Sequence, residues 1–200
     1  MSLRIRGHPR FDEFRDWFRG HPQYFVPWHG TLFRFQTVDF PASRAVLSGE
    51  GARVYGGRWN PPGFAALYGS TDDATALAEC KAHDRYYGVA TKSPRLLVAF
   101  DAKLARVLDL TQPTTRRAMR VTLKEFMAED WRKALSSGRE SFTQALGRAV
   151  HAAGGSGIIV RSAVVRRGIN GIVFPGNLPK DELSVVGASA LERLAPHLPG

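Results

Sequence analysis

The sequence predicts a single domain of the α+β class. Three observations favour this class: strand-like segments are clustered, helical segments come between them at irregular intervals, and no internal repeat or linker interrupts the chain. The 200 residues are enough for one domain with a well-buried core. We therefore expect an N-terminal helical extension over residues 1–30 and one compact domain over residues 31–200.

The first 37 residues contain a helical pattern, a loop pattern and a strand pattern. Phenylalanines at helical spacing predict an amphipathic helix over residues 9–19. Two prolines between residues 21 and 30 favour a connecting loop. Residues 31–37 alternate and predict a strand, with two phenylalanines on one face and Arg34 on the other.

The middle of the chain combines a long loop with a short strand and a helix. We expect the loop over residues 40–64 and the strand over residues 65–69. Ser70 and the acidic residues after it mark the start of a helix over about residues 71–86. Glu79 falls near one flank of the packed face of that helix.

The second half of the chain is expected to contain both helices and strands. Its apolar residues between 123 and 135 are interpreted as core. The expected elements are strands over residues 95–100 and 106–110 around a turn, helical pieces over 114–153 broken near 136–138, strands over 157–161 and 170–174 joined by a basic turn, and a short element over 189–194.

Composition excludes several classes of protein. Hydrophobic residues make up 44% and charged residues 23%, which is typical of a globular protein. No run of about 18 apolar residues is present, so we expect a cytoplasmic protein without a membrane partner. Cys80 is the single cysteine, which excludes an intrachain disulfide and cysteine-rich zinc sites. With His83 it could form a nucleophile and base, but a small hydrophobic role is favoured.

The net charge of +10 indicates an anionic partner without saying which one. Nucleic acid, an acidic protein and a phosphorylated substrate all fit. The basic residues are scattered, and no helix-turn-helix, zinc finger or RNA-binding strand signature is recognisable. We therefore expect no direct contact with nucleic acid, and interpret most arginines as solvated surface residues.

The segment over residues 48–63 indicates a ligand pocket. Its glycines and prolines shape a loop, from which Arg58 and Asn60 present polar groups. Tyr68 and Glu79 follow on regular elements that can hold them rigidly. The pattern is typical of a site for a phosphorylated small molecule.

Eight pieces of sequence together resemble the RES-domain family, the toxin half of RES and Xre toxin–antitoxin pairs. They occur in order over about residues 31–175, which makes the match more specific than any one glycine-rich loop. The pieces are Leu32-Phe-Arg-Phe35, Leu47-Ser-Gly-Glu-Gly-Ala-Arg53, Gly56-Gly-Arg-Trp-Asn-Pro-Pro-Gly63, Ala66-Leu-Tyr68, Ala76-Leu-Ala-Glu79, Val107-Leu-Asp-Leu110, Gln144-Ala-Leu-Gly147 and Gly157-Ile-Ile-Val-Arg-Ser162.

The resemblance implies a fold similar to the ADP-ribosyltransferase toxins, with small, twisted, mostly antiparallel sheets flanked by helices. It implies that NAD is a substrate rather than a cofactor, and that its nicotinamide bond is cleaved with water or phosphate as acceptor. It also implies an Xre-type antitoxin that covers the active site and through which any DNA binding occurs, and it leaves open a homodimer within that complex.

The resemblance implies catalytic roles for Arg34, Tyr68 and Glu79, and substrate binding by Arg58 and Ser162. Many relatives have tyrosine after the first arginine. Phe35 stands there in this chain and is expected beside the substrate without a hydroxyl.

The residues themselves suggest what each could do. A carboxylate such as Glu79 stabilises the oxocarbenium-like centre that forms when a nicotinamide riboside bond breaks. The forked donors of Arg34 and Arg58 suit a pyrophosphate. A tyrosine ring can face nicotinamide while its hydroxyl reaches ribose. The alternative, purely structural roles are a surface glutamate, surface arginines and a core tyrosine.

Three further residues complete the expected substrate-binding set. Asn60 and the flexible Gly57 could bring backbone donors close to the ligand, and Gln144 could face the site. Since the histidines have no ligand spacing, no metal is expected.

The favoured function is therefore a type II toxin that cleaves the nicotinamide N-glycosidic bond of NAD as a glycohydrolase or phosphorylase, and so depletes the cell's NAD. One alternative is a mono-ADP-ribosyltransferase that modifies a protein. An alternative of another class is a non-catalytic basic interaction module.

Overall fold

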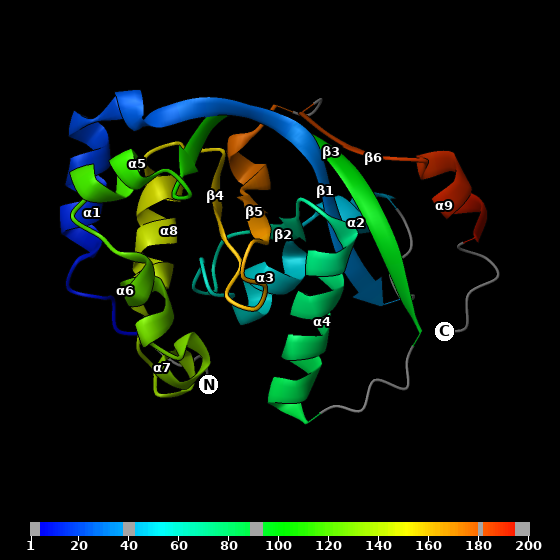
Figure 1. Ribbon diagram of the computed structural model, residues 1–200, viewed down its shortest axis with the longest axis horizontal. Coiled ribbons are helices and arrows are strands. Elements are labelled where there is room, and N and C mark those ends of the chain that lie inside the picture. The colour runs from blue at the N-terminus through cyan, green and yellow to red at the C-terminus, as the bar shows by residue number, and fades with distance from the viewer. Residues whose placement is uncertain (1–4, 38–42, 89–93, 180–181, 195–200) are drawn as a thin grey trace.

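The computed structural model describes residues 5–37, 43–88, 94–179 and 182–194. Its centre is a sheet with strand order β1-β2-β5-β4-β3-β6, which closes on itself because β1 also pairs with β3. Within the described residues every pairing is antiparallel except β3 with β4. Helices surround this sheet (Figure 1), which confirms the predicted α+β class. The strands are β1 (Phe25–Thr37), β2 (Leu67–Ser70), β3 (Arg95–Asp109), β4 (Gly157–Arg161), β5 (Ile169–Val173) and β6 (Leu183–Val185).

The two longest strands, β1 and β3, pair along their whole length and form the arch seen in Figure 1. The loop predicted over residues 21–30 is wrong, because most of it belongs to β1. Pro27 lies at a bulge between Val26 and Trp28, where a residue without an N–H group is tolerated. The turn predicted between residues 100 and 106 is also wrong: buried Ala102 and Leu104 alternate with exposed neighbours in one continuous strand.

The N-terminal helix predicted from the phenylalanine spacing is α1 (Phe11–Gly20), and it packs against α8 (Phe142–Ala152). Phe14 and Phe18 are buried in the same apolar cluster as Leu146 and Val150 of α8. A short 3-10 helix, η1 (Pro22–Tyr24), connects α1 to β1. The proposed division of the chain into residues 1–30 and 31–200 stays a prediction.

The long loop predicted over residues 40–64 contains two short helices, α2 (Ser43–Leu47) and α3 (Glu50–Tyr55). The prediction missed them because five or six residues are too few to show a helical period. The next helix, α4 (Asp73–Tyr87), was predicted almost in full. Its N-cap is Asp72, whose carboxylate accepts from the Thr75 backbone at 2.7 Å.

The helical region after β3 is divided into more pieces than predicted, with the expected break after Ser136. Phe126 and Trp131 are buried as predicted, but Leu123 and Met127 are exposed. Strand β6 was not predicted, whereas β4 and β5 lie within one residue of their predicted bounds. The remaining elements are α5 (Pro113–Ala118), α6 (Leu123–Ala128), α7 (Trp131–Ser136), the 3-10 helix η2 (Pro175–Asn177) and α9 (Ala188–Leu194).

The loop that follows α3 is fixed by contact with α8. A Cβ atom added at Gly147 would lie 1.8 Å from the Trp59 carbonyl oxygen, so the α8 backbone approaches the loop too closely for any side chain. Trp59 is itself 4% exposed and packs edge-on against Phe126. Gly147 is therefore the position at which helix and loop meet.

We expect Gly147→Ala to destabilise the protein by about 2 kcal/mol or more, because neither the α8 backbone nor the Trp59 carbonyl can move freely. Urea unfolding followed by circular dichroism measures the change. Gly51→Ala in α3 is the matched control: a Cβ there meets nothing within 4 Å, so stability should be unchanged or slightly raised. Equal unfolding midpoints for Gly147→Ala and the natural protein would contradict the packing argument.

Candidate functional site

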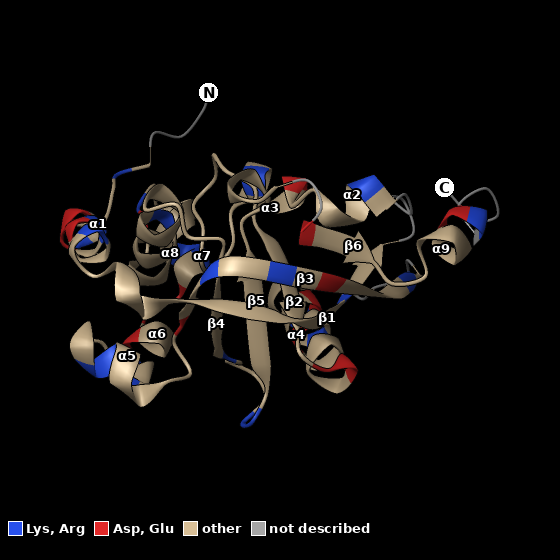
Figure 2. Cartoon of the chain, turned by 90° about the horizontal axis from the view of Figure 1, so that it is seen from above, with Lys and Arg blue, Asp and Glu red and all other residues tan. Residues whose placement is uncertain are grey.

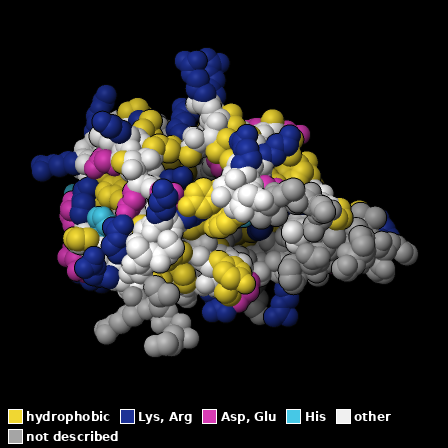
Figure 3. Space-filling view, turned by 90° about the horizontal axis from the view of Figure 1, so that it is seen from below, with side chains coloured by type: hydrophobic (Ala, Val, Ile, Leu, Met, Phe, Trp, Pro, Cys, Tyr) yellow, Lys and Arg dark blue, Asp and Glu magenta, His cyan; other side chains and the backbone are white. Residues whose placement is uncertain are grey.

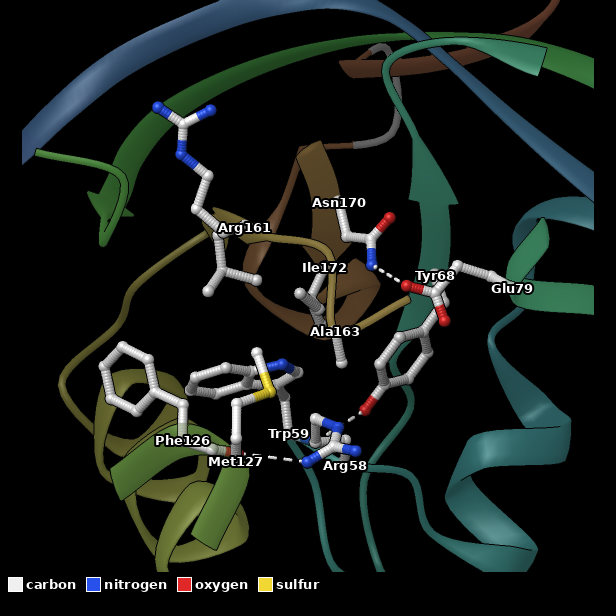
Figure 4. Close-up of a pocket in the computed structure, with 11 residues that line it drawn as sticks. Arg58, Trp59, Tyr68, Glu79, Phe126, Met127, Arg161, Ala163, Asn170 and Ile172 are labelled. Atoms are coloured by element: carbon white, nitrogen blue, oxygen red, sulfur yellow. Dashed lines mark hydrogen bonds between the residues drawn. The ribbon is translucent and has the colours of Figure 1, made fainter. Parts of the chain in front are cut away.

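A pocket lies between α4, α6, the loop after α3 and the ends of β4 and β5 (Figure 4). It encloses about 460 Å³, including the part open to solvent. Polar groups enter it from opposite walls, Glu79 from α4 and Arg58 from the loop, while Tyr68 lies between them. The lining residues are Arg58, Trp59, Tyr68, Glu79, Phe126, Met127, Val160, Arg161, Ala163, Asn170 and Ile172.

Glu79 is held through one of its two carboxylate oxygens. Its Oε1 atom accepts a hydrogen bond from Ser162 Oγ and another from Asn170 Nδ2, both at 2.7 Å. Such short bonds to a carboxylate are among the stronger hydrogen bonds in proteins. Among the described residues, no side chain or backbone group is bonded to Oε2, and that atom is left for a ligand.

Ser162 is placed beside Glu79 by the turn between β4 and β5. Its hydroxyl oxygen accepts hydrogen bonds from the backbone N–H groups of Val164 at 3.0 Å and Val165 at 2.9 Å, and its O–H group donates a hydrogen bond to Glu79. A hydroxyl has one proton and two lone pairs, so these three bonds use its full capacity. Ser162 therefore orients Glu79. The hydroxyl has no proton or lone pair left for the direct substrate contact that the resemblance implies for Ser162.

Asn170 was missed by the sequence analysis. It lies on β5 opposite Ser70 of β2, on the same sheet face as Ile172. The signal that could have revealed it is an amide side chain at the start of an otherwise apolar strand, two residues before a buried isoleucine. Arg161 and Met127 were also not predicted to line the pocket.

Arg58 lies at the tip of a tight turn that is closed by the Gly57 N–H donating to the Asn60 carbonyl at 2.8 Å. Its Nη1 atom donates to the Phe126 carbonyl at 3.0 Å, which ties the turn to α6. Desolvation by burial lowers the pKa of Arg58, the charge of Arg132 lowers it further, and Glu79 opposes the shift. An anion in the pocket would relieve this cost.

The Tyr68 hydroxyl forms hydrogen bonds with the same turn. It accepts from the Trp59 N–H at 2.9 Å and donates to Asn60 Oδ1 at 2.8 Å, and burial raises its pKa above the ordinary value for tyrosine. A Cβ added at Gly57 would lie 2.4 Å from this hydroxyl oxygen. Gly57 thus permits the approach of Tyr68. The proton of the Tyr68 hydroxyl is used on Asn60, so only the ring and one lone pair of the oxygen remain for a ligand. A contact of this hydroxyl with ribose stays a prediction.

Direct ligand contacts by the side chains of Asn60 and Gln144 are not supported by the structure. Both side chains are fully buried. The Asn60 amide donates to the carbonyls of Ala52 and Pro61. Gln144 forms a capping box with Ser141 at the start of α8 and donates to the Gly57 carbonyl at 2.9 Å. Both residues therefore shape the loop.

Arg34 lies on the other face of the sheet. Phe33 of β1 pairs with Ser70 of β2, so Phe33 shares the face of Tyr68, and Arg34 points away from it. Its Nη1 atom donates to the Val46 carbonyl of α2 at 3.4 Å, and burial lowers its pKa. Phe35 shares the Tyr68 face but is not among the residues that line the pocket. Arg34 and Phe35 were both expected in the site, but neither is among the residues that line this pocket.

Among the described residues, no group of three or more histidine, cysteine, aspartate or glutamate side chains could hold a metal ion. In the same residues, no helix is long and apolar enough to cross a membrane. Cys80 and His83 both lie on α4 without a mutual hydrogen bond among those described, and His83 instead contacts Arg132.

Residues 31–194 match the RES domain family. Proteins named NAD(+) phosphorylase MbcT, from Mycobacterium bovis and from two strains of Mycobacterium tuberculosis, are each 33% identical to this chain over 143 residues. The alignment covers 68% of this chain and 74% of each relative.

A chain of the crystal structure of the M. tuberculosis MbcT–MbcA toxin–antitoxin complex has the same fold, with a TM-score of 0.63 and 25% sequence identity. The superposition covers 94% of this chain and 98% of that chain. The family match extends over most of the chain and agrees with both the curated relatives and the solved structure. The chain belongs to the RES domain family.

Proposed function

We propose that this protein is a toxin of a toxin–antitoxin system and that it cleaves the nicotinamide N-glycosidic bond of NAD with phosphate as acceptor. The observation that supports it best is Glu79, a carboxylate that lines the same pocket as Arg58 and has one oxygen fixed by two donors. The choice of NAD as substrate and phosphate as acceptor follows the relatives named NAD(+) phosphorylase.

The reaction breaks the bond between the ribose C1 atom and the nicotinamide nitrogen and forms a bond from C1 to a phosphate oxygen. Nicotinamide leaves as a neutral molecule, and positive charge grows on the ribose as the bond stretches. A carboxylate about 4 Å from that charge, at an effective dielectric constant of about 20, is worth about 4 kcal/mol. This contact exists mainly in the transition state, so it accelerates cleavage.

The other polar groups of the pocket suit the rest of NAD. Arg58 uses Nη1 on the Phe126 carbonyl and keeps its remaining N–H groups for the pyrophosphate. The Tyr68 ring provides a flat apolar surface for nicotinamide. Asn60, Gly57 and Gln144 keep Arg58 and Tyr68 in place, and Ser162 orients Glu79.

The toxin's partner would be an antitoxin that blocks access to the pocket, because the matched solved structure is a toxin–antitoxin complex. An Xre-type antitoxin, DNA binding through it, and a homodimer within the complex extend this proposal. The β4–β5 connection contains Arg166 and Arg167, and Figure 2 shows basic residues at its tip. This connection begins beside Arg161 and Ala163 of the pocket wall. An acidic segment of the antitoxin would be attracted to this tip.

The test is to incubate the purified protein with NAD, with and without inorganic phosphate, and to separate the products by chromatography. We expect nicotinamide and a phosphorylated ADP-ribose, with the rate depending on phosphate. Free ADP-ribose at the same rate without phosphate would identify a glycohydrolase. Transfer of label from NAD to a protein would favour a mono-ADP-ribosyltransferase, and unchanged NAD would favour a non-catalytic basic module.

Replacing the carboxylate should nearly abolish cleavage. We expect Glu79→Gln to lower kcat roughly a thousandfold, because about 4 kcal/mol of transition-state stabilisation is lost. The rate of nicotinamide release measures this, and expression of the variant should no longer arrest growth. Glu50→Gln, which removes an exposed carboxylate of α3, is the matched control and should leave kcat unchanged. A Glu79→Gln variant within tenfold of the natural kcat would refute the assignment.

Removing the guanidinium of Arg58 should raise KM for NAD more than it lowers kcat. We expect Arg58→Met to raise KM for NAD about tenfold to a hundredfold, since a charge-assisted hydrogen bond is worth about 1.5–3 kcal/mol. Steady-state kinetics at several NAD concentrations separate KM from kcat. Arg19→Met, at an exposed position on α1, controls for the loss of one positive charge. An unchanged KM for Arg58→Met would contradict the role given to Arg58.

A further inference from the structure

We propose that Asn170 is a positioning residue for Glu79 and that Ser70 in turn fixes Asn170. The inference rests on the proposed function, because it concerns how the carboxylate of that reaction is oriented. Three side chains form a hydrogen-bonded chain from β2 through β5 to α4. Ser70 Oγ donates to Asn170 Oδ1 at 2.8 Å, and Asn170 Nδ2 donates to Glu79 Oε1 at 2.7 Å.

The direction of these two hydrogen bonds is set by which groups can donate and which can only accept. An ionised carboxylate only accepts hydrogen bonds, so the group of Asn170 that faces Glu79 has to be the amide nitrogen. The amide oxygen then faces Ser70, whose hydroxyl supplies a proton. A flipped Asn170 would place two acceptors against each other at the Glu79 end. Ser70 thereby locks the amide in its single productive orientation.

The backbone supports the same arrangement. Ser70 and Asn170 are direct partners in the antiparallel pairing of β2 and β5, so their side chains leave the same face next to each other. Ser70 is 3% exposed and Asn170 is half-buried at the pocket wall. Figure 4 shows the Asn170 amide directed at the Glu79 carboxylate. Rigid strands thus hold the donor, and α4 brings the acceptor to it.

Two donors on one oxygen determine where the other oxygen lies. Rotation about the last bond of a glutamate side chain is soft, and a single hydrogen bond from Ser162 would leave the carboxylate free to swing. Asn170 adds a second direction at the same Oε1 atom. With both donors present, the carboxylate is held in one orientation at the pocket wall, and Oε2 carries no hydrogen bond from the described residues.

The test is Asn170→Asp, a substitution of nearly equal size that replaces the donor with a repelling carboxylate oxygen. We expect kcat for NAD cleavage to fall on the order of 10- to 100-fold, with KM for NAD changed by less than about threefold. Ser70→Ala should cause a smaller loss of kcat, since it loosens Asn170 without touching Glu79. A split between kcat and KM separates positioning from substrate binding.

A matched control is Asn177→Asp. Asn177 donates through Nδ2 to the carbonyls of His151 and Gly155, away from the pocket, so the same chemical change is made at a purely structural site. It should lower the thermal midpoint while leaving kcat per folded molecule unchanged. If Asn170→Asp acted only by destabilising the fold, the two variants would show the same behaviour, and that result would overturn the inference.

A double-mutant cycle completes the test. In a Glu79→Gln background the Asn170→Asp change should cause no further loss of kcat, because the residue acts through the carboxylate. A natural-level kcat for Asn170→Asp in an otherwise active protein, or an equal loss in both backgrounds, would refute this inference alone. An inactive natural protein, or an active Glu79→Gln variant, would overturn the proposed function as well.

Discussion

The candidate site depends on the register with which β2 pairs with β5. Tyr68 is opposite Ile172 and Ser70 is opposite Asn170, so all four side chains leave the same face of the sheet. A slip of one residue would turn Tyr68 to the opposite face. The same strand runs directly into α4, because Asp72 caps that helix two residues after β2 ends. The register therefore sets where Glu79 enters the pocket as well as what it meets there.

Most of the polar side chains around the pocket hold other protein groups, which leaves few for a ligand. Asn60, Gln144 and the Tyr68 hydroxyl all bind the turn around Arg58, and their burial makes each unmade bond costly. What this scaffold presents is a partly desolvated guanidinium on one wall and a carboxylate oxygen on the other. Desolvation by burial and the charge of Arg132 lower the pKa of Arg58, while Glu79 opposes the shift. A substrate with an anionic part and a developing cation can satisfy both walls.

The sequence predicted those parts of the fold that have clear local signals. The two strands β4 and β5 are short apolar runs bounded by glycine and polar residues, and α4 begins with an acidic cap. The β1–β3 arch was predicted only in part, because its length comes from pairing between distant residues and not from local pattern. Asn170 could not be singled out for the same reason: its partners, Glu79 and Ser70, are brought to it only by the sheet and α4.

The resemblance implied a set of residues for the site but could not say which of them touch each other. Glu79, Ser162, Tyr68 and Arg58 come together, whereas Arg34 lies on the opposite face, near Val46, in the structure described. Its Nε atom is buried without a hydrogen-bond partner among the described residues, which is costly for a guanidinium. Basic side chains are also spread widely over the face shown in Figure 3, so net charge does not identify which arginine binds substrate. Of these two arginines only Arg58 lines the pocket together with Glu79, so the geometry favours Arg58 over Arg34 as the cation that meets the substrate.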